Sequence, residues 1–428
     1  MTTSFSLHEL EKYFDNLDVP LQETHCLVAF SGGLDSTVLA RAMMELARLR
    51  GGKITLAHVN HRLRQSAADD ETFCRSFATD FNVPLVVCQL DSSGRGSESV
   101  EAWARRERYA ALENIAHNVG AQWILTGHHA DDQAETVLMR LRQQAPFITM
   151  AGIRPRRGRI LRPLLEFTRA ALHTWAQGHD LVWIEDPSNE DRAYLRNRLR
   201  LDDLTALRRQ NPGAVDALTG LAGLAQQYEH SCAREAEELL RQSTADPVAG
   251  ILSFPLKAVR SQADDVLRLA IYSTLEQYFA ATDRLSGAHW HSLRQFVRFA
   301  ETGKVFDITK NVKMLKDREA LLLFDPLANV SPEPRRLRPG KTTWGGHLLE
   351  VAGHDGKVDD LSLSLRSWHS GDRLANGRHG KGKLVSDIFI NGRVNRLDKQ
   401  QWPMVTDEHD RVIWVPGLMD PRKQLEYS

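Results

Sequence analysis

Residues 26–37 read Cys26-Leu-Val-Ala-Phe-Ser-Gly-Gly-Leu-Asp-Ser-Thr37. The apolar residues 27–30 form a run of the length expected for a short buried strand. The polar, glycine-rich residues 31–36 then interrupt the run, and a helical pattern begins at Thr37. Paired glycines permit a tight turn whose N–H groups can converge on an anion at the positive end of the following helix. The alternative is an ordinary β–α turn that binds no ligand, in which Asp35 or Ser36 caps the helix.

Outward from this stretch, short apolar runs alternate with amphipathic segments. We expect strands at residues 54–59, 84–90 and 123–126, and helices at residues 38–50, 66–81 and 97–119. This alternation predicts an α/β fold with a doubly wound parallel sheet. Ligands of such sheets bind outside the carboxyl ends of the strands, where residues 31–36, 58–61 and 127–132 fall. We therefore expect these three loops to meet at one site.

The length of 428 residues exceeds what one hydrophobic core usually supports. Asn211-Pro212-Gly213 is a strong helix breaker, and the proline-rich residues 326–341 look like a linker. We expect a catalytic domain at 1–212, a mainly helical domain at 213–325 and a small α+β domain at 326–428. In the last of these, the clearest strand-like runs are 361–365, 388–390 and 412–415.

Composition limits the environment and the partners. Lysine plus arginine equals aspartate plus glutamate at 55 each, so a nucleic-acid partner would have to be held by local patches. The four cysteines contain no CxxC pair, which argues against a zinc ribbon, an iron–sulfur cluster or a disulfide framework. No apolar run reaches the roughly 20 residues of a membrane span, and the amino terminus has no signal-peptide pattern. We expect a cytoplasmic protein that does not enter a membrane.

Two polar constellations carry candidate functional residues. Arg105 and Arg108 share a helix face, and the residues alone favour solvated arginines paired with Glu101 and Glu107. His128-His129-Ala-Asp131-Asp132-Gln-Ala-Glu-Thr136 follows a strand and opens a helix. Its histidines and aspartates could chelate a divalent metal or simply cap the helix, and the residues alone leave both readings open.

Basic residues also cluster twice outside these constellations. Residues 154–162 carry five arginines, which suit either a phosphate backbone or a solvated linker. Residues 366–399 carry eight lysines or arginines against Asp372, Asp387 and Asp398, with Trp368 and Phe389 interleaved. Such a patch can grip phosphates and stack on an unpaired base, or it can be an ordinary exposed surface.

Taken together, these motifs resemble a known family. The string SGGLDS matches the pyrophosphate loop, SGGxDS, of the N-type ATP pyrophosphatases. With the E-x-x-A-R-x-x-R-Y helix and HHADDQAET, it resembles the tRNA(Ile)-lysidine synthetase family. The match continues in the segments Arg162-Pro-Leu-Leu165, Trp183-Ile-Glu-Asp-Pro-Ser-Asn189, Arg196-Asn-Arg-Leu-Arg200, Gly371-Asp-Arg373, Leu384-Val-Ser-Asp-Ile-Phe389 and Val412-Ile-Trp-Val-Pro-Gly-Leu418.

The resemblance implies an enzyme that uses ATP and Mg²⁺ to adenylate carbon-2 of the wobble cytosine in an isoleucine tRNA with a CAU anticodon. Free L-lysine then displaces AMP to form lysidine. The resemblance leaves a homodimer open. Its implied nucleotide-binding residues are Ser31, Gly32, Gly33, Leu34, Asp35, Ser36, His58 and His129, with Asp35 supporting Mg²⁺. Its implied catalytic residues are Asp35, Arg105, Arg108, Asp131, Asp132 and Gln133.

One segment departs from the family, which commonly has an R-G-S-G loop after the DDQxET helix. This chain has Arg142-Gln-Gln-Ala-Pro146-Phe-Ile-Thr-Met-Ala-Gly152, in which a proline fixes φ where the family has glycine.

The rival functions are a tRNA thiolase, which commonly needs paired cysteines, and a small-molecule synthetase, which would not need the basic residues 366–399. A metal phosphohydrolase built on His128, His129, Asp131 and Asp132 and a non-catalytic tRNA-binding protein complete the set.

Overall fold

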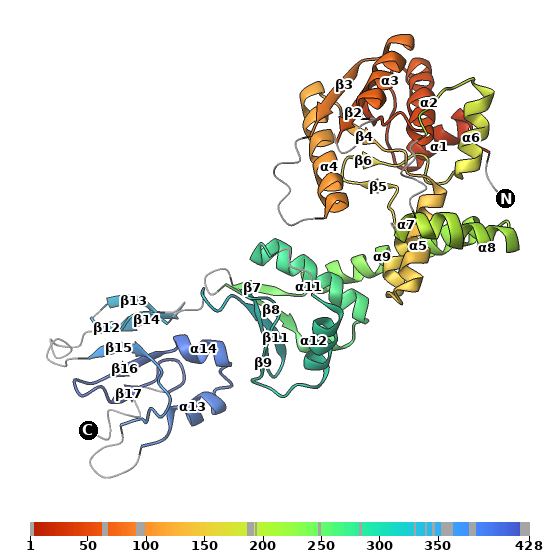
Figure 1. Ribbon diagram of the computed structural model, residues 1–428. Helices are drawn as coiled ribbons and strands as arrows, with labels where there is room; N and C mark the ends of the chain where they lie inside the picture. Colours follow the sequence, from red (N-terminus) through yellow and green to blue (C-terminus); the bar gives the residue numbers. More distant parts are fainter. Residues whose placement is uncertain are drawn as a thin grey trace. The chain divides into compact units, whose positions relative to one another are not determined.

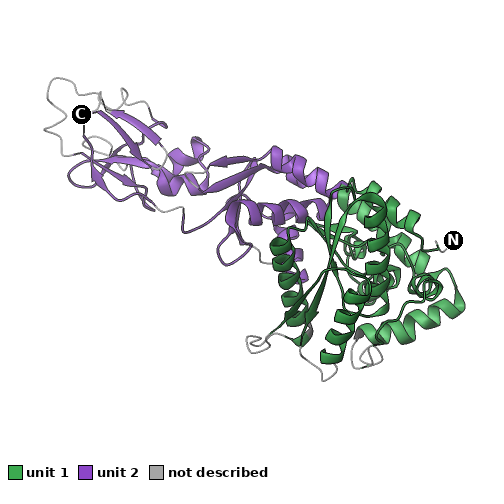
Figure 2. Ribbon diagram, turned by 90° about the horizontal axis from the view of Figure 1, so that it is seen from above, with its two compact units in different colours: residues 1–230 green, residues 231–428 purple. Residues whose placement is uncertain are grey.

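The computed structural model describes residues 4–61, 67–90, 99–185, 192, 195–246, 250–281, 285–328, 331–338, 340–344, 347–351, 363–375 and 382–419. The chain divides into two compact units, residues 1–230 and 231–428 (Figure 2). Helix α9 (Ala214–Arg241) runs from the first unit into the second. The division into three domains at residues 212 and 325 stays a prediction.

A six-stranded sheet in the order β3-β2-β1-β4-β6-β5 organises the first unit (Figure 1). Its first five strands in this order are parallel, and β5 is antiparallel to β6 at one edge. The strands are β1 (His25–Ala29), β2 (Lys53–Asn60), β3 (Leu85–Gln89), β4 (Trp123–Leu125), β5 (Arg156–Arg157) and β6 (Ile160–Leu161). The strand order reverses direction at β1, which lies between β2 and β4.

Helices cover both faces of this sheet because alternate strand residues point to opposite sides. Val28, Leu56 and Leu125 pack in one core with α1 (Leu7–Asn16), α2 (Leu34–Arg50), α3 (Ala67–Asp80) and α6 (Arg169–Gly178). Leu27 and Ile124 pack on the other face against α4 (Val100–Val119). The doubly wound sheet predicted from the sequence is therefore confirmed, with boundaries within a few residues of those expected.

Four further helical segments of the first unit follow the helix that the HHADDQAET motif opens. That helix, α5, spans Ala130–Arg142, and the 3₁₀ helix η2 (Phe147–Ala151) follows it. Farther along, α7 (Leu195–Arg198), the π-helical turn η4 (Leu199–Leu204) and α8 (Thr205–Gln210) follow one another without a break. The turn η4 contacts α5, so these helices lie side by side (Figure 1).

The second unit begins with the helical region that we predicted, but it also contains a sheet that we did not. Its helices are α10 (Leu256–Arg260), α11 (Asp264–Phe279) and α12 (Gly287–Phe299). The antiparallel sheet has the order β7-β8-β11-β10-β9. Its strands are β7 (Thr244–Asp246), β8 (Ile251–Pro255), β9 (Val305–Asp307), β10 (Lys313–Lys316) and β11 (Ala320–Phe324). These strands are short and lie among helices, so their apolar residues gave no separate period-2 signal.

The last part of the chain has a four-stranded sheet in the order β12-β15-β16-β17 and a separate hairpin, β13-β14. These strands are β12 (Arg335–Arg336), β13 (Gly340–Trp344), β14 (His347–Val351), β15 (Ser364–Ser367), β16 (Pro403–Thr406) and β17 (Val412–Trp414). Two short helices, α13 (Val385–Asn391) and α14 (Arg396–Gln401), complete it. No helix in the described ranges is long and apolar enough to cross a membrane.

The strand predicted at residues 388–390 is wrong, because these residues belong to α13. Val385, Ile388 and Phe389 are buried together, and their spacing of three and four residues is the helical one. A three-residue apolar run is too short for its period to be read in isolation. The predictions at 361–365 and 412–415 are confirmed where the chain is described, since β15 and β17 lie there.

Candidate functional site

The phosphate loop connects β1 to α2, and one of its two glycines is required by the backbone. Gly32 has φ of +83°, and a Cβ there would lie 2.8 Å from Ile184 Cδ1 and 3.0 Å from Phe73 Cδ1. Gly33 has φ of −74°, and a Cβ there would meet only ordinary contacts, at 3.7 Å from Ser31 Oγ and 3.8 Å from the Ile184 oxygen. The fold therefore needs glycine at 32, whereas at 33 it leaves the space open.

The topology brings the loop after β4 against the phosphate loop. Because β1 and β4 are neighbouring parallel strands, both loops leave the sheet at the same edge. A Cβ at Gly127 would lie 3.2 Å from the Asp35 carbonyl carbon and 3.3 Å from the Ser36 nitrogen. Only a residue without a side chain lets the two loops approach this closely. The predicted meeting of residues 31–36 with residues 127–132 is confirmed.

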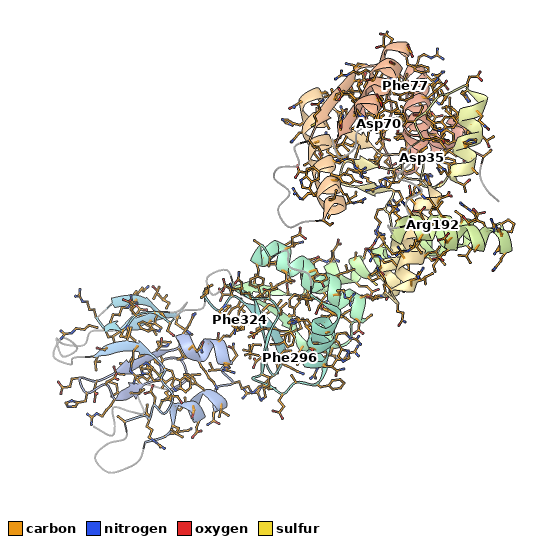
Figure 3. The ribbon with its side chains drawn as sticks, viewed as in Figure 1. Asp35, Asp70, Phe77, Arg192, Phe296 and Phe324 are labelled. Carbon is orange, nitrogen blue, oxygen red and sulfur yellow. The ribbon has the colours of Figure 1, made fainter. Side chains whose placement is uncertain are left out.

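Asp35, labelled in Figure 3, lies in the first turn of α2. Its Oδ1 is buried and has no hydrogen-bond partner, while Oδ2 lies 3.5 Å from His129 Nε2. The helix has Gly33 as its N-cap and no side-chain cap, so its first N–H groups are not used by a capping side chain. The unsatisfied carboxylate oxygen suits Mg²⁺. The free N–H groups at the positive end of the helix suit the phosphates of ATP.

The other residues of the loop shape it. Ser36 Oγ donates to the Gly33 oxygen at 2.9 Å and lies 3.1 Å from Ser31 Oγ. Leu34 is buried in the core, so only its backbone can face a ligand. His58 is buried at the end of β2, where its Nδ1 lies 3.0 Å from the Phe30 oxygen and its Nε2 has no partner.

Three carboxylates of α5 are paired with arginines from the helical segment 195–210. Arg196 Nη2 and Arg200 Nη2 lie 3.0 and 3.1 Å from Asp132 Oδ1. The same two guanidiniums bind Glu135, through Arg196 Nε at 2.8 Å and Arg200 Nε at 2.5 Å. Arg208 forms an ion pair with Asp131. All three carboxylates are buried, and guanidiniums offset the cost of burying their charges.

His129 lies among three carboxylates, those of Asp35, Asp131 and Asp132. Its ring nitrogens lie 3.7 Å from oxygens of Asp131 and Asp132, in addition to the contact with Asp35. Burial alone would lower the pKa of His129, but these carboxylates outweigh burial and raise the pKa to about 9. Burial also raises the pKa of Asp132, yet His129 and Arg196 reverse the effect and lower the pKa to about 2.

His128 differs from its neighbour because burial dominates. Burial lowers the pKa of His128 to about 3, against the opposing attraction of Asp132. Its Nδ1 lies 2.9 Å from Thr126 Oγ1. His128 is therefore neutral at physiological pH, while His129 is an imidazolium among carboxylates. Of the two predicted roles for this pair, helix capping is the one observed, since His129 is the N-cap of α5 and its backbone N–H donates to Asp132 Oδ2 at 3.0 Å.

Gln133 is buried and contacts the end of the segment that replaces the family's glycine loop. Its Oε1 accepts from Ile153 N at 2.7 Å, and its Nε2 donates to the Ile153 oxygen at 3.2 Å. Gln226 of α9 donates to the Ala151 and Ile153 oxygens at 2.8 and 3.1 Å. Gly152, with φ of +56°, has no room for a Cβ because Gln133 Oε1 would lie 2.5 Å away. Gln133 thus holds this segment in place, and its amide is already used.

The two arginines predicted on α4 have different environments. Arg105 and Arg108 both lie over the Tyr109 ring, 5.4 and 5.7 Å from its centroid. Arg105 is exposed, whereas burial lowers the pKa of Arg108, which also feels the charge of Arg196. Arg108 is therefore the one near the ion pairs between α5 and residues 195–210. We call these ion pairs the carboxylate–arginine cluster; its members are Asp131, Asp132, Glu135, Arg196, Arg200 and Arg208.

The predicted basic stretch 154–162 is used largely within the fold. Arg162 is buried, and its Nη1 donates to the Arg154 oxygen at 2.7 Å. Arg154 is paired with Glu229, and Arg159 donates to the Ala121 oxygen. These contacts favour the structural reading of the stretch over a phosphate-binding surface.

Sequence reasoning missed Glu135, Arg196, Arg200 and Arg208 as members of the site. The first three carried a usable signal. Asp132 and Glu135 are three apart on one helix, and Arg196 and Arg200 are four apart on another, so each pair shares a face with complementary charge. Arg208 carried no such signal, because in a regular helix it would not lie on that face.

Comparison with known proteins identifies the fold and the enzyme type. Residues 6–206 match the family model of the PP-loop domain. Residues 6–206 form a PP-loop domain. A tRNA(Ile)-lysidine synthase of Parabacteroides distasonis is 29% identical over 99% of this chain and 97% of its own, and one of Thermotoga maritima is 27% identical over 92% and 91%. A bifunctional protein TilS/HprT of Listeria monocytogenes is 26% identical over 98% of this chain and 68% of its own length.

These matches cover both compact units, so this PP-loop protein is an enzyme of the tRNA(Ile)-lysidine synthase type. PP-loop proteins of this type process tRNA and use ATP. The rival metal phosphohydrolase needed a chelating group at His128, His129, Asp131 and Asp132. No cluster of three or more candidate metal ligands occurs in the part of the chain that the structure describes, and Asp131 and Asp132 are paired with arginines.

The two glycines of the PP loop should respond differently to alanine. Gly33→Ala should leave stability near that of the wild type, since its Cβ meets only ordinary contacts, but should lower AMP formation at least about tenfold by crowding a phosphate. Gly32→Ala should lower the free energy of unfolding by about 1–2 kcal/mol, because φ of +83° disfavours a side chain. Thermal unfolding and AMP release measure the two effects. Full activity of Gly33→Ala would contradict phosphate binding at this loop.

Proposed function

We propose that the protein uses ATP to join L-lysine to carbon-2 of the wobble cytosine of isoleucine tRNA with a CAU anticodon. The cytosine oxygen attacks the α-phosphorus of ATP, and pyrophosphate leaves. The lysine ε-amine then forms a bond to carbon-2, loses a proton, and AMP departs with the former cytosine oxygen. The observation that carries the proposal is the meeting of the PP loop with the carboxylate–arginine cluster of α5, in a chain whose full-length relatives are tRNA(Ile)-lysidine synthases.

The residues of the PP loop bind and orient ATP in this proposal. The loop amides at residues 32–36 hold the β- and γ-phosphates, and Ser31 and Ser36 add hydroxyl donors. Asp35 holds Mg²⁺, which neutralises phosphate charge when bound. Arg108, rather than the exposed Arg105, offsets the charge that develops on the α-phosphate.

The carboxylate–arginine cluster arranges the second substrate. Asp132 and Glu135 each hold Arg196 and Arg200, so the guanidiniums are fixed before a substrate arrives. Lysine is protonated in water, with a pKa of about 10.4, and must lose a proton before it attacks. A carboxylate of α5 that received its ammonium would exchange one of these arginines for it. We expect the reaction to take place in the cytoplasm.

The order of events gives the most direct test. Enzyme, tRNA and ATP labelled in the α-phosphate should form a labelled tRNA when lysine is omitted, with release of pyrophosphate. Lysine should then discharge labelled AMP in proportion to the lysidine formed. The matched control is Asp35→Ala, which should form no labelled tRNA. Release of orthophosphate, or a tRNA that never carries the label, would refute the proposed reaction.

Exposed basic residues on either side of α13 supply the proposed contact with tRNA, with one change from the patch predicted from the sequence. Arg366 is buried between Asp372 and Asp410, with nitrogen–oxygen distances of 2.7 Å, so it cannot reach a phosphate. Lys383 and Arg393 are exposed. Lys381, which belongs to the same patch, lies outside the described residues.

Reversing the charge of the exposed pair should weaken tRNA binding. Lys383→Glu with Arg393→Glu should raise the Kd for tRNA and reduce the salt dependence of binding by about 1 logarithmic unit of slope for each lost phosphate contact. The KM for ATP should not change. Lys257→Glu with Lys310→Glu makes the same charge change at exposed positions of the same unit and should have the smaller effect. Equal effects of the two pairs on the Kd for tRNA in a salt titration would show that the patch is an ordinary exposed surface and makes no specific contact with tRNA.

A further inference from the structure

Arg208 begins a chain of charged contacts that ends at the PP loop. Its guanidinium donates to Asp131 Oδ1. The second oxygen of Asp131 accepts from Arg169 N at 2.9 Å, at the start of α6, and lies 3.7 Å from His129 Nδ1. On the other side of the same ring, His129 Nε2 lies 3.5 Å from Asp35 Oδ2. A helix distant from the PP loop in sequence is thus linked through two side chains to its aspartate.

This contact depends on the π-helical turn η4. Arg196 and Arg208 are twelve positions apart, and in an unbroken α-helix that spacing rotates the second residue by about 120° from the first. A π-turn takes up one extra residue, so the effective spacing is eleven positions, which corresponds to a rotation of about 20°. The turn Leu199–Leu204 lies between the two arginines. It therefore brings Arg208 onto the face that Arg196 and Arg200 already present to α5.

The pairing differs from an ordinary surface ion pair. Asp131 is buried, so a charge there is costly unless a cation offsets it. The neighbouring Arg209 shows the contrast, because it is exposed and forms no ion pair within the described ranges. Of the two adjacent arginines of α8, only the one that the π-turn aligns, Arg208, pairs with Asp131 in the described part of the chain.

We propose that Arg208 is a positioning residue for adenylation, which holds Asp131 so that His129 keeps its place against Asp35, and that the π-turn exists to align Arg208. This inference rests on the proposed function. Arg208 itself does not touch ATP or tRNA in this account. It acts on the PP loop through Asp131 and His129, so its loss slows adenylation without weakening the grip on tRNA.

The test compares Arg208→Gln with Arg209→Gln and Arg208→Lys. The readouts are the rate of labelled AMP–tRNA formation without lysine, the Kd for tRNA and the temperature of unfolding. Arg208→Gln should lower the adenylation kcat by about 10- to 100-fold, the range found when a partner of a ligand-holding residue is removed. The Kd for tRNA should not change. Arg208→Lys should recover part of the rate, and Arg209→Gln should behave like the wild type.

Two outcomes of this comparison would overturn the proposal. Equal adenylation rates for folded Arg208→Gln and Arg209→Gln would show that Arg208 positions nothing. A raised Kd for tRNA with unchanged kcat would make Arg208 a phosphate contact instead. A wild-type protein that forms no AMP–tRNA would refute the proposed function, which is a different result from either of these.

Changes in the length of the turn provide an independent test if Arg208→Gln does not fold. Deletion of the exposed Asp202 should close the π-turn into α-helix and keep Arg208 aligned at eleven positions, so adenylation should persist. Insertion of one alanine after Asp202 should rotate Arg208 by about 100° and abolish adenylation. Loss of adenylation in the folded deletion variant, or its retention in the insertion variant, would overturn the role given to the turn.

Discussion

The pairing of buried α5 carboxylates with arginines of residues 195–210 is the interaction on which the site depends. Asp132 and Glu135 could not be buried as charged groups without guanidiniums beside them. Because Arg196 and Arg200 each contact both carboxylates, the pairing also fixes how the two helical segments lie against each other. Removal of one partner would leave an uncompensated charge in the interior, so the cluster behaves as a unit.

The position of this cluster follows from the sheet. Parallel strands β1 and β4 lie side by side, and the loops at their carboxyl ends approach so closely that only glycine fits at residue 127. That approach places His129, the residue before α5, against Asp35 at the start of α2. The PP loop and the carboxylate–arginine cluster of α5 are thus joined by the topology of a doubly wound sheet.

Much of this could be predicted from the sequence because the signals were local. The strand, the glycine turn and the start of α2 all lie within residues 26–37, and the HHADDQAET motif marks its own helix start. The second unit was harder, since three-residue strands such as Val305–Asp307 carry too few residues to show a period. The π-turn could not be predicted, because one extra residue in a helix leaves the composition unchanged while it rotates everything that follows. Arg208 was missed for that reason. The catalytic role of Gln133 was implied by the family resemblance and stays a prediction. Its amide binds the backbone of Ile153, a partner twenty residues away that no local pattern indicates.

The central claim is that Asp35 and the PP loop bind the nucleotide while the α5 carboxylates remain with their arginines. A crystal structure with Mg²⁺ and a non-hydrolysable ATP analogue tests it most directly. We expect the β- and γ-phosphates on the amides of residues 32–36, the metal on Asp35, and Arg196 and Arg200 still between Asp132 and Glu135. A metal held by Asp131 and Asp132 with the arginines displaced, or a nucleotide bound away from the PP loop, would contradict the account.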